Sequence, residues 1–245
     1  MYCALLVSAC VEGNGASEGR FNGFGGYREE LDDLEDVIAH FRKEASSAKH
    51  ASVETQGGQA GGGGGGGGGG DASRYVPAQY KIVALIGHSK GASTVLHYAA
   101  AHDDVDVIVS LAARFDMRVG IRERLGDERM RELETTGKTT YSNAALTNRR
   151  EIEVTMHQYQ QRISLDNTLI NSGTIKKTRK LRFIHGDNDS VIPSKDAQRF
   201  ADQFDEFDAS IADARAVILE GCGHSFFKHS DACASIVLDA LSEAL

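Results

Sequence analysis

The hydrophobic residues of this chain fall into short apolar runs that alternate with segments of helical spacing. Five apolar runs have the length and composition of buried strands, at residues 2–10, 81–86, 105–112, 181–185 and 216–220. Segments with apolar residues at helical spacing lie at 28–44, 90–101, 195–207 and 231–245. Because strands that alternate with helices form βαβ units, the pattern predicts a mostly parallel sheet flanked by helices, an α/β fold.

The first helical segment shows the pattern most plainly. Its apolar residues are Leu31, Leu34, Val37, Ile38 and Phe41, which share one face of a helix. Acidic residues crowd its first turns, where the helix dipole favours negative charge. An amphipathic helix is therefore predicted over residues 28–44.

Two segments interrupt this alternation. Residues 45–60 are small and polar, and Gly61–Gly70 is an unbroken glycine run that cannot offset its ordering entropy by burial. We therefore expect a disordered insertion over 45–78. Residues 117–178 are charged and helix-like. With 41% hydrophobic residues in a chain of 245, we expect a single domain, 1–245.

The strongest local signal for chemistry is GHSKG at Gly87–Gly91, set between an apolar strand and a helical segment. A serine on such a turn is held in a strained backbone, and the flanking glycines avoid clashes with the neighbouring strand and helix. The hydroxyl of Ser89 would then project above the sheet as a nucleophile. The backbone N–H of Lys90 would point at a developing oxyanion from the N-terminus of the following helix.

A general base should come from a loop after the last strand, because that loop overhangs the nucleophile at the carboxyl edge of the sheet. His224 lies in such a loop, in EGCGHSFF. A neutral imidazole takes a serine proton at physiological pH and returns it to a leaving group. His185 ends the preceding strand, and no catalytic role is predicted for it.

The acid that orients the histidine should follow the preceding strand. HGDNDSVIP offers Asp187 and Asp189 there, and position alone leaves the choice open. The chain order Ser, Asp, His is that of α/β-hydrolases.

Nucleotide and metal sites are not expected, and no cofactor is predicted. The glycine run is not followed by Lys and Ser/Thr at P-loop spacing, and Gly137–Thr139 has Glu132 where the first P-loop glycine belongs. In the DND segment, Val191 occupies the third ligand position of an EF-hand loop.

Charge and cysteine content exclude further classes. The net charge of −8 argues against a nucleic-acid partner. No apolar segment approaches the roughly 20 residues that span a bilayer. The four cysteines are too sparse for a disulfide scaffold, and Cys10 ends a VSAC stretch without the basic residues of a lipoprotein signal. A soluble, cytoplasmic protein is expected. Residues 117–182 carry an excess of Lys and Arg, which would attract an anionic substrate such as an acyl-CoA or a phospholipid headgroup.

Three stretches together carry a family resemblance: GHSKGAS, IHGDNDSVIPSKDA and LEGCGHSF. They resemble the esterase, lipase and thioesterase-like α/β-hydrolases grouped with the serine aminopeptidases. The resemblance implies that Asp189 is the acid and that 117–178 forms a cap over the active site. It also implies a Ser89–Asp189–His224 triad that cleaves a small-molecule acyl ester or thioester through an acyl-serine intermediate.

The sequence departs from this family at its start. Family members carry earlier strands and an HG-type loop, which supplies a second oxyanion N–H, before the strand that corresponds to residues 2–10. Their third strand lies between the strands that correspond to 2–10 and 81–86. The expectation is therefore an N-terminally truncated α/β-hydrolase fold. The alternatives are a catalytically impaired ligand-binding or partner-binding protein, and a serine aminopeptidase.

Overall fold

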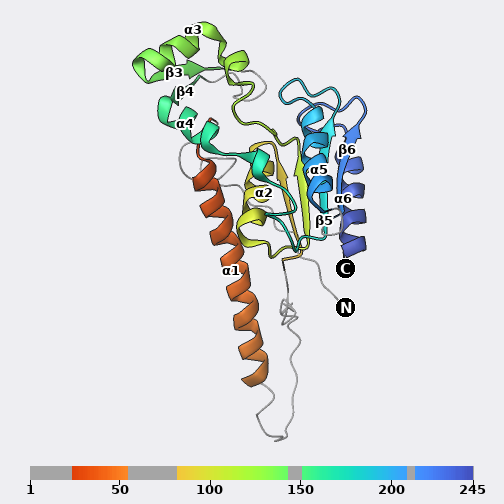
Figure 1. Ribbon diagram of the computed structural model, residues 1–245. Helices are drawn as coiled ribbons and strands as arrows, with labels where there is room; N and C mark the ends of the chain where they lie inside the picture. The colour runs from red at the N-terminus through yellow and green to blue at the C-terminus, as the bar shows by residue number, and fades with distance from the viewer. Residues whose placement is uncertain (1–23, 55–81, 143–150, 209–212, 245) are drawn as a thin grey trace, which may run out of the picture. The chain divides into compact units, whose positions relative to one another are not determined.

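A computed structural model describes residues 24–54, 82–142, 151–208 and 213–244 (Figure 1). The strand predicted at residues 2–10 and the run Gly61–Gly70 lie outside the described residues. The chain divides into two compact units, of which one comprises Met1–Ala9 with Glu35–Ile82 and the other Cys10–Leu34 with Val83–Leu245.

The described part of the first unit is mainly the later portion of helix α1 (Tyr27–Glu54), whose first two turns belong to the second unit. The helix was expected to end near Glu44, and it continues for ten further residues. The added stretch, ASSAKHASVE, contains alanine, lysine and glutamate, which have high helix propensity, and no glycine or proline. The remainder of the predicted insertion, residues 55–78, lies outside the described residues.

The second unit is built on a four-stranded parallel sheet. Its strands are β1 (Ala84–His88), β2 (Val107–Leu111), β5 (Lys180–Gly186) and β6 (Asp213–Leu219), in the order β1-β2-β5-β6. All neighbouring pairs are parallel. The carboxyl ends of the strands therefore meet at one edge of the sheet, where loops from distant parts of the sequence converge. This confirms the predicted α/β class.

All four strands differ in their bounds from the prediction, and β1 and β6 differ most. β1 begins at Ala84 and includes Gly87 and His88, which pair with Ser110 and Leu111 of β2. β6 begins three residues earlier than expected, since Asp213 pairs with the first residue of β5 and the ladder continues through seven positions. Pairing with a neighbouring strand, rather than apolar character alone, sets where these strands begin and end.

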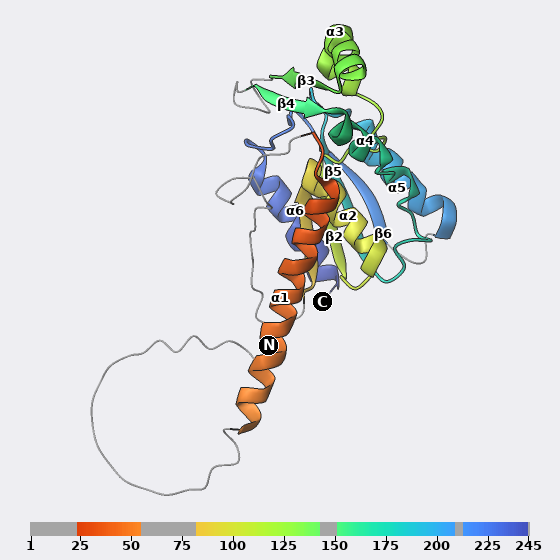
Figure 2. The ribbon, with the colours of Figure 1, turned by 90° about the vertical axis from the view of Figure 1, so that its left-hand side faces the viewer.

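Helices cover both faces of the sheet. Figure 2 shows α6 (Ser230–Ala244) on one side and α2 (Lys90–His102) with α5 (Lys195–Asp208) on the other. On the α6 side, a buried cluster joins alternate strand residues to the helix: Val107, Val109, Ile184, Ala240 and Ala244. On the α5 side, the Phe183 ring stacks on Phe200 with centroids 5.2 Å apart. None of the helices in the described residues is long and apolar enough to cross a membrane.

The segment between β2 and β5 carries its own small core. It contains α3 (Ile121–Thr136), β3 (Lys138–Tyr141), β4 (Ile152–Thr155), α4 (Met156–Ser164) and a short 3₁₀ helix (Asn167–Leu169). Side chains from both α3 and the β3–β4 pair are buried together: Ile121, Leu125, Met130, Leu133, Tyr141 and Val154. The antiparallel β3–β4 pair was not predicted, because its strands have only four residues each and lie among charged residues of helical character.

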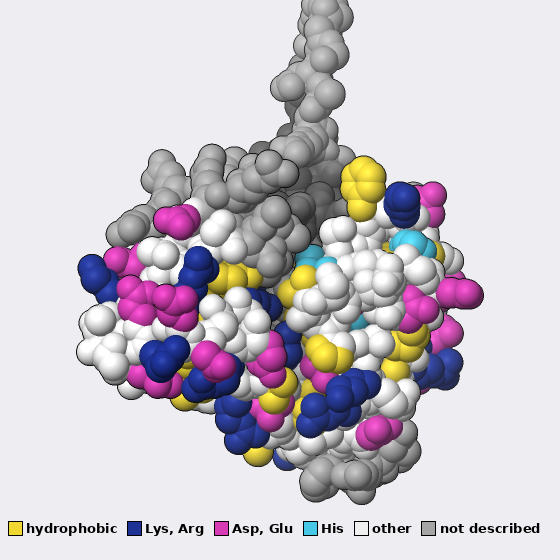
Figure 3. All heavy atoms as spheres, turned by 90° about the horizontal axis from the view of Figure 1, so that it is seen from above, with side chains coloured by type: hydrophobic (Ala, Val, Ile, Leu, Met, Phe, Trp, Pro, Cys, Tyr) yellow, Lys and Arg dark blue, Asp and Glu magenta, His cyan; other side chains and the backbone are white. Residues whose placement is uncertain are grey.

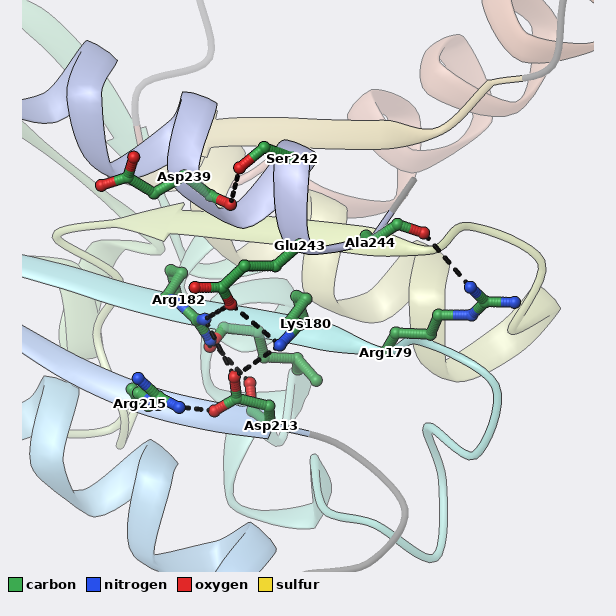
Figure 4. A network of polar contacts seen from close by, with 10 residues as sticks. Arg179, Lys180, Arg182, Asp213, Arg215, Asp239, Ser242, Glu243 and Ala244 are labelled. Carbon is green, nitrogen blue, oxygen red and sulfur yellow. Dashed lines mark hydrogen bonds and ion pairs between the residues drawn. The ribbon is translucent and has the colours of Figure 1, made fainter.

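A network of charges joins β5, β6 and α6 at the amino-terminal end of the strands (Figure 4). The Asp213 carboxylate accepts hydrogen bonds from Lys180 at 2.9 Å and from Arg182 at 3.0 Å. Both cations also pair with Glu243 of α6. Burial acts to raise the pKa of Asp213, but the hydrogen bonds from Lys180 and Arg182 outweigh it and lower the pKa to about 2. The network joins β5, β6 and α6 at the edge of the sheet opposite the carboxyl ends of the strands.

Candidate active site

The turn after β1 holds Ser89 in an unusual backbone conformation. Its φ of 56° and ψ of −110° place a non-glycine residue in the left-handed half of the Ramachandran map, which costs free energy. The Ser89 N–H donates to the carbonyl of Leu111 on the adjacent strand at 2.8 Å, which helps to fix the turn. The strand, the strained serine and the helix match the arrangement predicted from GHSKG.

The two glycines of this turn have different roles. A Cβ at Gly87 would collide with the backbone carbonyl of Gly91, so that β1 and the first turn of α2 approach each other only without a side chain there. A Cβ at Gly91 would meet nothing within 4 Å. The expectation that both flanking glycines prevent a clash therefore holds for Gly87 and is wrong for Gly91.

His224 lies in the loop between β6 and α6 and faces the serine. Its Nε2 is 2.9 Å from Ser89 Oγ, at hydrogen-bond distance. The side chain of His88 also holds this loop, because its Nε2 donates to the backbone carbonyl of His224 at 2.8 Å. The rings of His88 and His224 are in contact, with centroids 5.1 Å apart, and His88 makes an edge contact with Phe226. Contacts with Ser89 and His88 thus fix the position of the His224 imidazole.

Asp189 lies in the loop after β5, on the other side of the imidazole. His224 Nδ1 is 2.8 Å from Asp189 Oδ2, and the Asp189 side chain is fully buried. Burial acts to raise the pKa of Asp189, but hydrogen bonds from His185, His224 and the N–H groups of Ile192 and Val191 outweigh it and hold the pKa far below its usual range. The carboxylate therefore stays ionised next to the histidine.

Asp187, the other acid considered, is oriented differently. Its Oδ1 accepts a hydrogen bond from the N–H of Gly221 at 2.7 Å, in the turn that follows β6. That contact joins the loop after β5 to the loop that carries His224. Of the two carboxylates, Asp189 is the one at hydrogen-bond distance from the His224 ring.

One residue near the candidate triad was missed by the sequence reasoning. His185, at the end of β5, is completely buried, and its Nε2 lies 3.0 Å from Asp189 Oδ2 and 3.0 Å from the carbonyl of Ile192. It thus shares with His224 the same carboxylate oxygen. The sequence signal for His185 is its place four residues before Asp189 in HGDND. Assigning it only to the end of a strand leaves that spacing unused.

Lys90, whose N–H was expected to serve an oxyanion, is the first residue of α2 and follows Ser89 directly. Its N–H is therefore at the positive end of the helix dipole. The side chain extends to α1, where Nζ pairs with Glu30 at 2.7 Å. Burial lowers the pKa of Lys90, and Glu30 opposes this shift.

The geometry can relay a proton. An imidazole with a serine hydroxyl on Nε2 and an ionised carboxylate on Nδ1 accepts the hydroxyl proton while its own charge is stabilised by the carboxylate. The three groups come from loops after β1, β5 and β6, all at the carboxyl edge of one parallel sheet. A parallel sheet of this kind with a strained serine after one strand defines the class as α/β-hydrolase.

Solved structures share this fold across nearly the whole chain. Est1E of Butyrivibrio proteoclasticus, solved with ferulic acid bound, aligns with a TM-score of 0.61 at 14% identity over 96% of this chain and 74% of its own. Mouse alpha/beta hydrolase domain-containing protein 10 gives a TM-score of 0.61 at 16% identity, over 95% and 75%. A monoacylglycerol lipase of Paleococcus ferrophilus gives 0.58 at 12% identity, over 94% and 80%.

The chain belongs to the family described as BAAT / acyl-CoA thioester hydrolase C terminal, which matches residues 73–227. The matched region includes Ser89, Asp189 and His224. No protein with a curated description matches the sequence.

Proposed function

We propose that the protein is a serine hydrolase that cleaves a carboxylic ester or thioester through an acyl-serine intermediate. The observation that carries the proposal is the continuous chain of contacts from Ser89 Oγ to His224 Nε2, 2.9 Å, and from His224 Nδ1 to Asp189 Oδ2, 2.8 Å. Family membership supports hydrolysis as the reaction.

In the first half of the reaction, His224 Nε2 takes the hydroxyl proton as Ser89 Oγ attacks the carbonyl carbon of the substrate. The carbonyl π electrons move to the oxygen, which becomes an oxyanion. Asp189 stabilises the imidazolium that forms, and the buried, ionised state of this carboxylate makes it suited to the task. Collapse of the tetrahedral intermediate expels the alcohol or thiol, which receives the proton from His224, and leaves an acyl ester on Ser89.

In the second half, water replaces the alcohol or thiol. His224 takes a proton from the water as its oxygen attacks the acyl-serine carbonyl, and a second oxyanion forms. Breakdown of that intermediate returns the proton to Ser89 Oγ and releases the carboxylic acid. The residues end in the states in which they began, as a catalytic cycle requires.

The N–H of Lys90 is the proposed donor to the oxyanion in both halves. It follows the nucleophile and begins α2, so that a preorganised dipole faces the place where negative charge develops. Loss of one such donor costs on the order of 10²–10³-fold in rate in other serine hydrolases.

The proposed substrates are small acyl esters or thioesters. Thioesters are favoured by the family, whose description names acyl-CoA thioester hydrolysis. Esters are favoured by structural neighbours that include a monoacylglycerol lipase. A serine nucleophile attacks either carbonyl by the same steps.

The proposal is tested by steady-state hydrolysis of p-nitrophenyl butyrate and of a butyryl thioester, with Ser89→Ala and, as a matched control, Ser242→Ala. Ser242 lies on α6, where its hydroxyl bonds only the Asp239 carbonyl among described residues. We expect Ser89→Ala to reduce kcat by at least ~10³-fold, and Ser242→Ala to leave it unchanged. Brief acid quenching should trap an acyl adduct on Ser89, detected by mass spectrometry. Turnover by Ser89→Ala at the wild-type rate would refute the proposal.

A further inference from the structure

Cationic side chains from four parts of the chain converge around Tyr27. Arg162 of α4 donates from Nη1 to the Tyr27 hydroxyl at 3.0 Å. The ammonium of Lys90 lies 5.1 Å from the centroid of the Tyr27 ring. Arg114, in the loop after β2, and Arg124, on α3, are close enough to Tyr27 and to Arg162 to interact electrostatically.

Among the residues that the structure describes, only one of these cations has a carboxylate partner. Lys90 pairs with Glu30, which also accepts a hydrogen bond from Thr94. Within the described part of the chain, no carboxylate lies at ion-pair distance from Arg114, Arg124 or Arg162. Asp196 interacts electrostatically with Arg114. Its carboxylate, however, accepts a hydrogen bond from the Phe115 N–H and pairs with Arg199. These three arginines, called the arginine cluster below, thus share a positive charge that no described carboxylate pairs with.

Two members of the arginine cluster are buried with unused hydrogen-bond donors. Arg114 and Arg162 are each 5% exposed, and the Nε of each is buried without a hydrogen-bond partner among the described residues. Burial, followed by the neighbouring arginines, lowers the pKa of both Arg114 and Arg124. Burying unpaired like charges is costly, and the cost is recovered when an anion binds between them.

Arg114 connects the arginine cluster to the loops that carry the candidate triad. Arg114 lies three residues beyond Leu111, whose carbonyl accepts the Ser89 N–H. Arg114 Nη2 donates to the carbonyl of Val191 at 2.7 Å, and the Val191 N–H in turn donates to Asp189. Figure 3 views the carboxyl edge of the sheet from above and shows Lys and Arg side chains within a hollow on this face, with a histidine at its edge.

We propose that the arginine cluster binds an anionic group of the substrate, a carboxylate or a phosphate, held close to the scissile carbonyl. The inference rests on the proposed hydrolase function and narrows its substrate to acyl esters or thioesters that carry such a group. Guanidinium groups are suited to it because their fixed N–H donors pair with both oxygens of a carboxylate or phosphate. A neutral substrate leaves the same buried donors unpaired, which is the physical basis for selection against it.

Substrate preference tests the inference in the active enzyme. The substrates are p-nitrophenyl hydrogen glutarate, which carries a free carboxylate, and its methyl-capped diester of equal length. We expect wild-type kcat/KM to favour the anionic ester by at least ~10-fold, mainly through KM. Arg124→Gln should abolish this preference, mainly by raising KM for the anionic ester. The matched control is Arg131→Gln, an exposed position on the same helix, which should retain the preference.

A binding measurement tests anion binding by the arginine cluster independently of catalysis and of folding. Ser89→Ala protein is titrated by calorimetry with glutarate, with inorganic phosphate and with dimethyl glutarate, and the titration is repeated with Arg124→Lys and Arg124→Gln added. Anion binding that is partly retained in Arg124→Lys and lost in Arg124→Gln supports the inference. Tighter binding of glutarate indicates a carboxylate as the bound group, and tighter binding of phosphate indicates a phosphate. Absence of binding by both anions overturns it.

The two proposals fail in different ways. Hydrolysis of the charged and the capped ester at equal kcat/KM would overturn the anion site and leave the serine hydrolase intact. Anion binding that depends on Arg124, in a protein that hydrolyses neither ester, would support the arginine cluster and contradict the proposed reaction.

Discussion

At the scale of the residue, Asp189 is the centre of the site's hydrogen bonding. Two histidines share its Oδ2, and the N–H groups of Val191 and Ile192 donate to its Oδ1 at 2.7 and 3.0 Å. A carboxylate held by this many donors is fixed in position as well as in charge. The imidazole of His224 thereby acquires one orientation and one tautomer.

Replacing Asp189 and Asp187 in turn should show which of the two carboxylates acts as the acid of the triad. Asp189→Asn would present an amide to His224 Nδ1 and disfavour the tautomer that accepts the serine proton, so kcat should fall on the order of 10³–10⁴-fold. The matched control is Asp187→Asn, because Asp187 bonds the Gly221 N–H rather than the histidine. Rates of p-nitrophenyl butyrate hydrolysis decide between them, and a larger loss in Asp187→Asn would transfer the acid role.

The candidate triad could be proposed from sequence because each residue follows an apolar strand within a distinctive local motif. The choice between Asp187 and Asp189 depended on the family resemblance, since both side chains belong to one loop. The arginine cluster has no local motif of this kind, although the excess of Lys and Arg over residues 117–182 favours an anionic substrate. Arg114 follows β2, Arg124 lies on α3 and Arg162 on α4, so that only packing in three dimensions brings them together.

At the scale of the element, the contact between β1 and α2 depends on one glycine. Gly87→Ala should force the strand and the helix apart and destabilise the protein by about 3 kcal/mol. Gly91→Ala adds the same methyl group four residues later, where it meets nothing, and should be neutral or slightly stabilising because alanine favours a helix. Urea unfolding of both variants provides the measurement. Equal destabilisation by the two changes would contradict this reading of the turn.

The network at the opposite end of the sheet predicts a dependence of stability on pH. Because the pKa of Asp213 is lowered to about 2 in the folded protein, its stabilising contribution is present above its unfolded value near 4 and is lost as pH falls through about 2. Asp213→Asn should therefore reduce the free energy of unfolding at pH 7 by about 1–2 kcal/mol, allowing for partial solvent screening.

Unfolding of wild type and Asp213→Asn at lower pH tests whether the charge of Asp213 causes the difference in stability. The difference between wild type and Asp213→Asn in urea unfolding should narrow between pH 4 and pH 2, as the wild-type carboxyl becomes protonated. Asp239→Asn, an exposed change on α6, serves as the control and should match wild type throughout. A difference that stays constant down to pH 2 would show that charge is not the source.

Most elements of the sheet could be predicted, because buried parallel strands are continuous apolar runs and the helices between them are amphipathic. The β3–β4 pair could not. Its alternation of exposed Lys138 and Thr140 with buried Thr139 and Tyr141 extends over four residues only, too few to be separated from a helical pattern. Strand ends were also misplaced, since they depend on the partner strand.

At the scale of the whole molecule, the family match and the site coincide. The matched residues 73–227 begin before β1 and end after His224, so they contain all three loops that form the proposed triad. The segment between β2 and β5 adds its own core and supplies all three clustered arginines. Loops of the parallel sheet thus carry the residues of the proposed reaction, and the segment between β2 and β5 carries the arginines proposed to select the substrate.

The most direct test of this account is covalent labelling of the protein with a fluorophosphonate, which reacts with a serine only when a neighbouring base activates it. The account predicts stoichiometric labelling that mass spectrometry maps to Ser89, is absent in Ser89→Ala and is strongly slowed in His224→Ala. Labelling that persists at the wild-type rate in Ser89→Ala, or a folded wild-type protein that does not label at all, would contradict it.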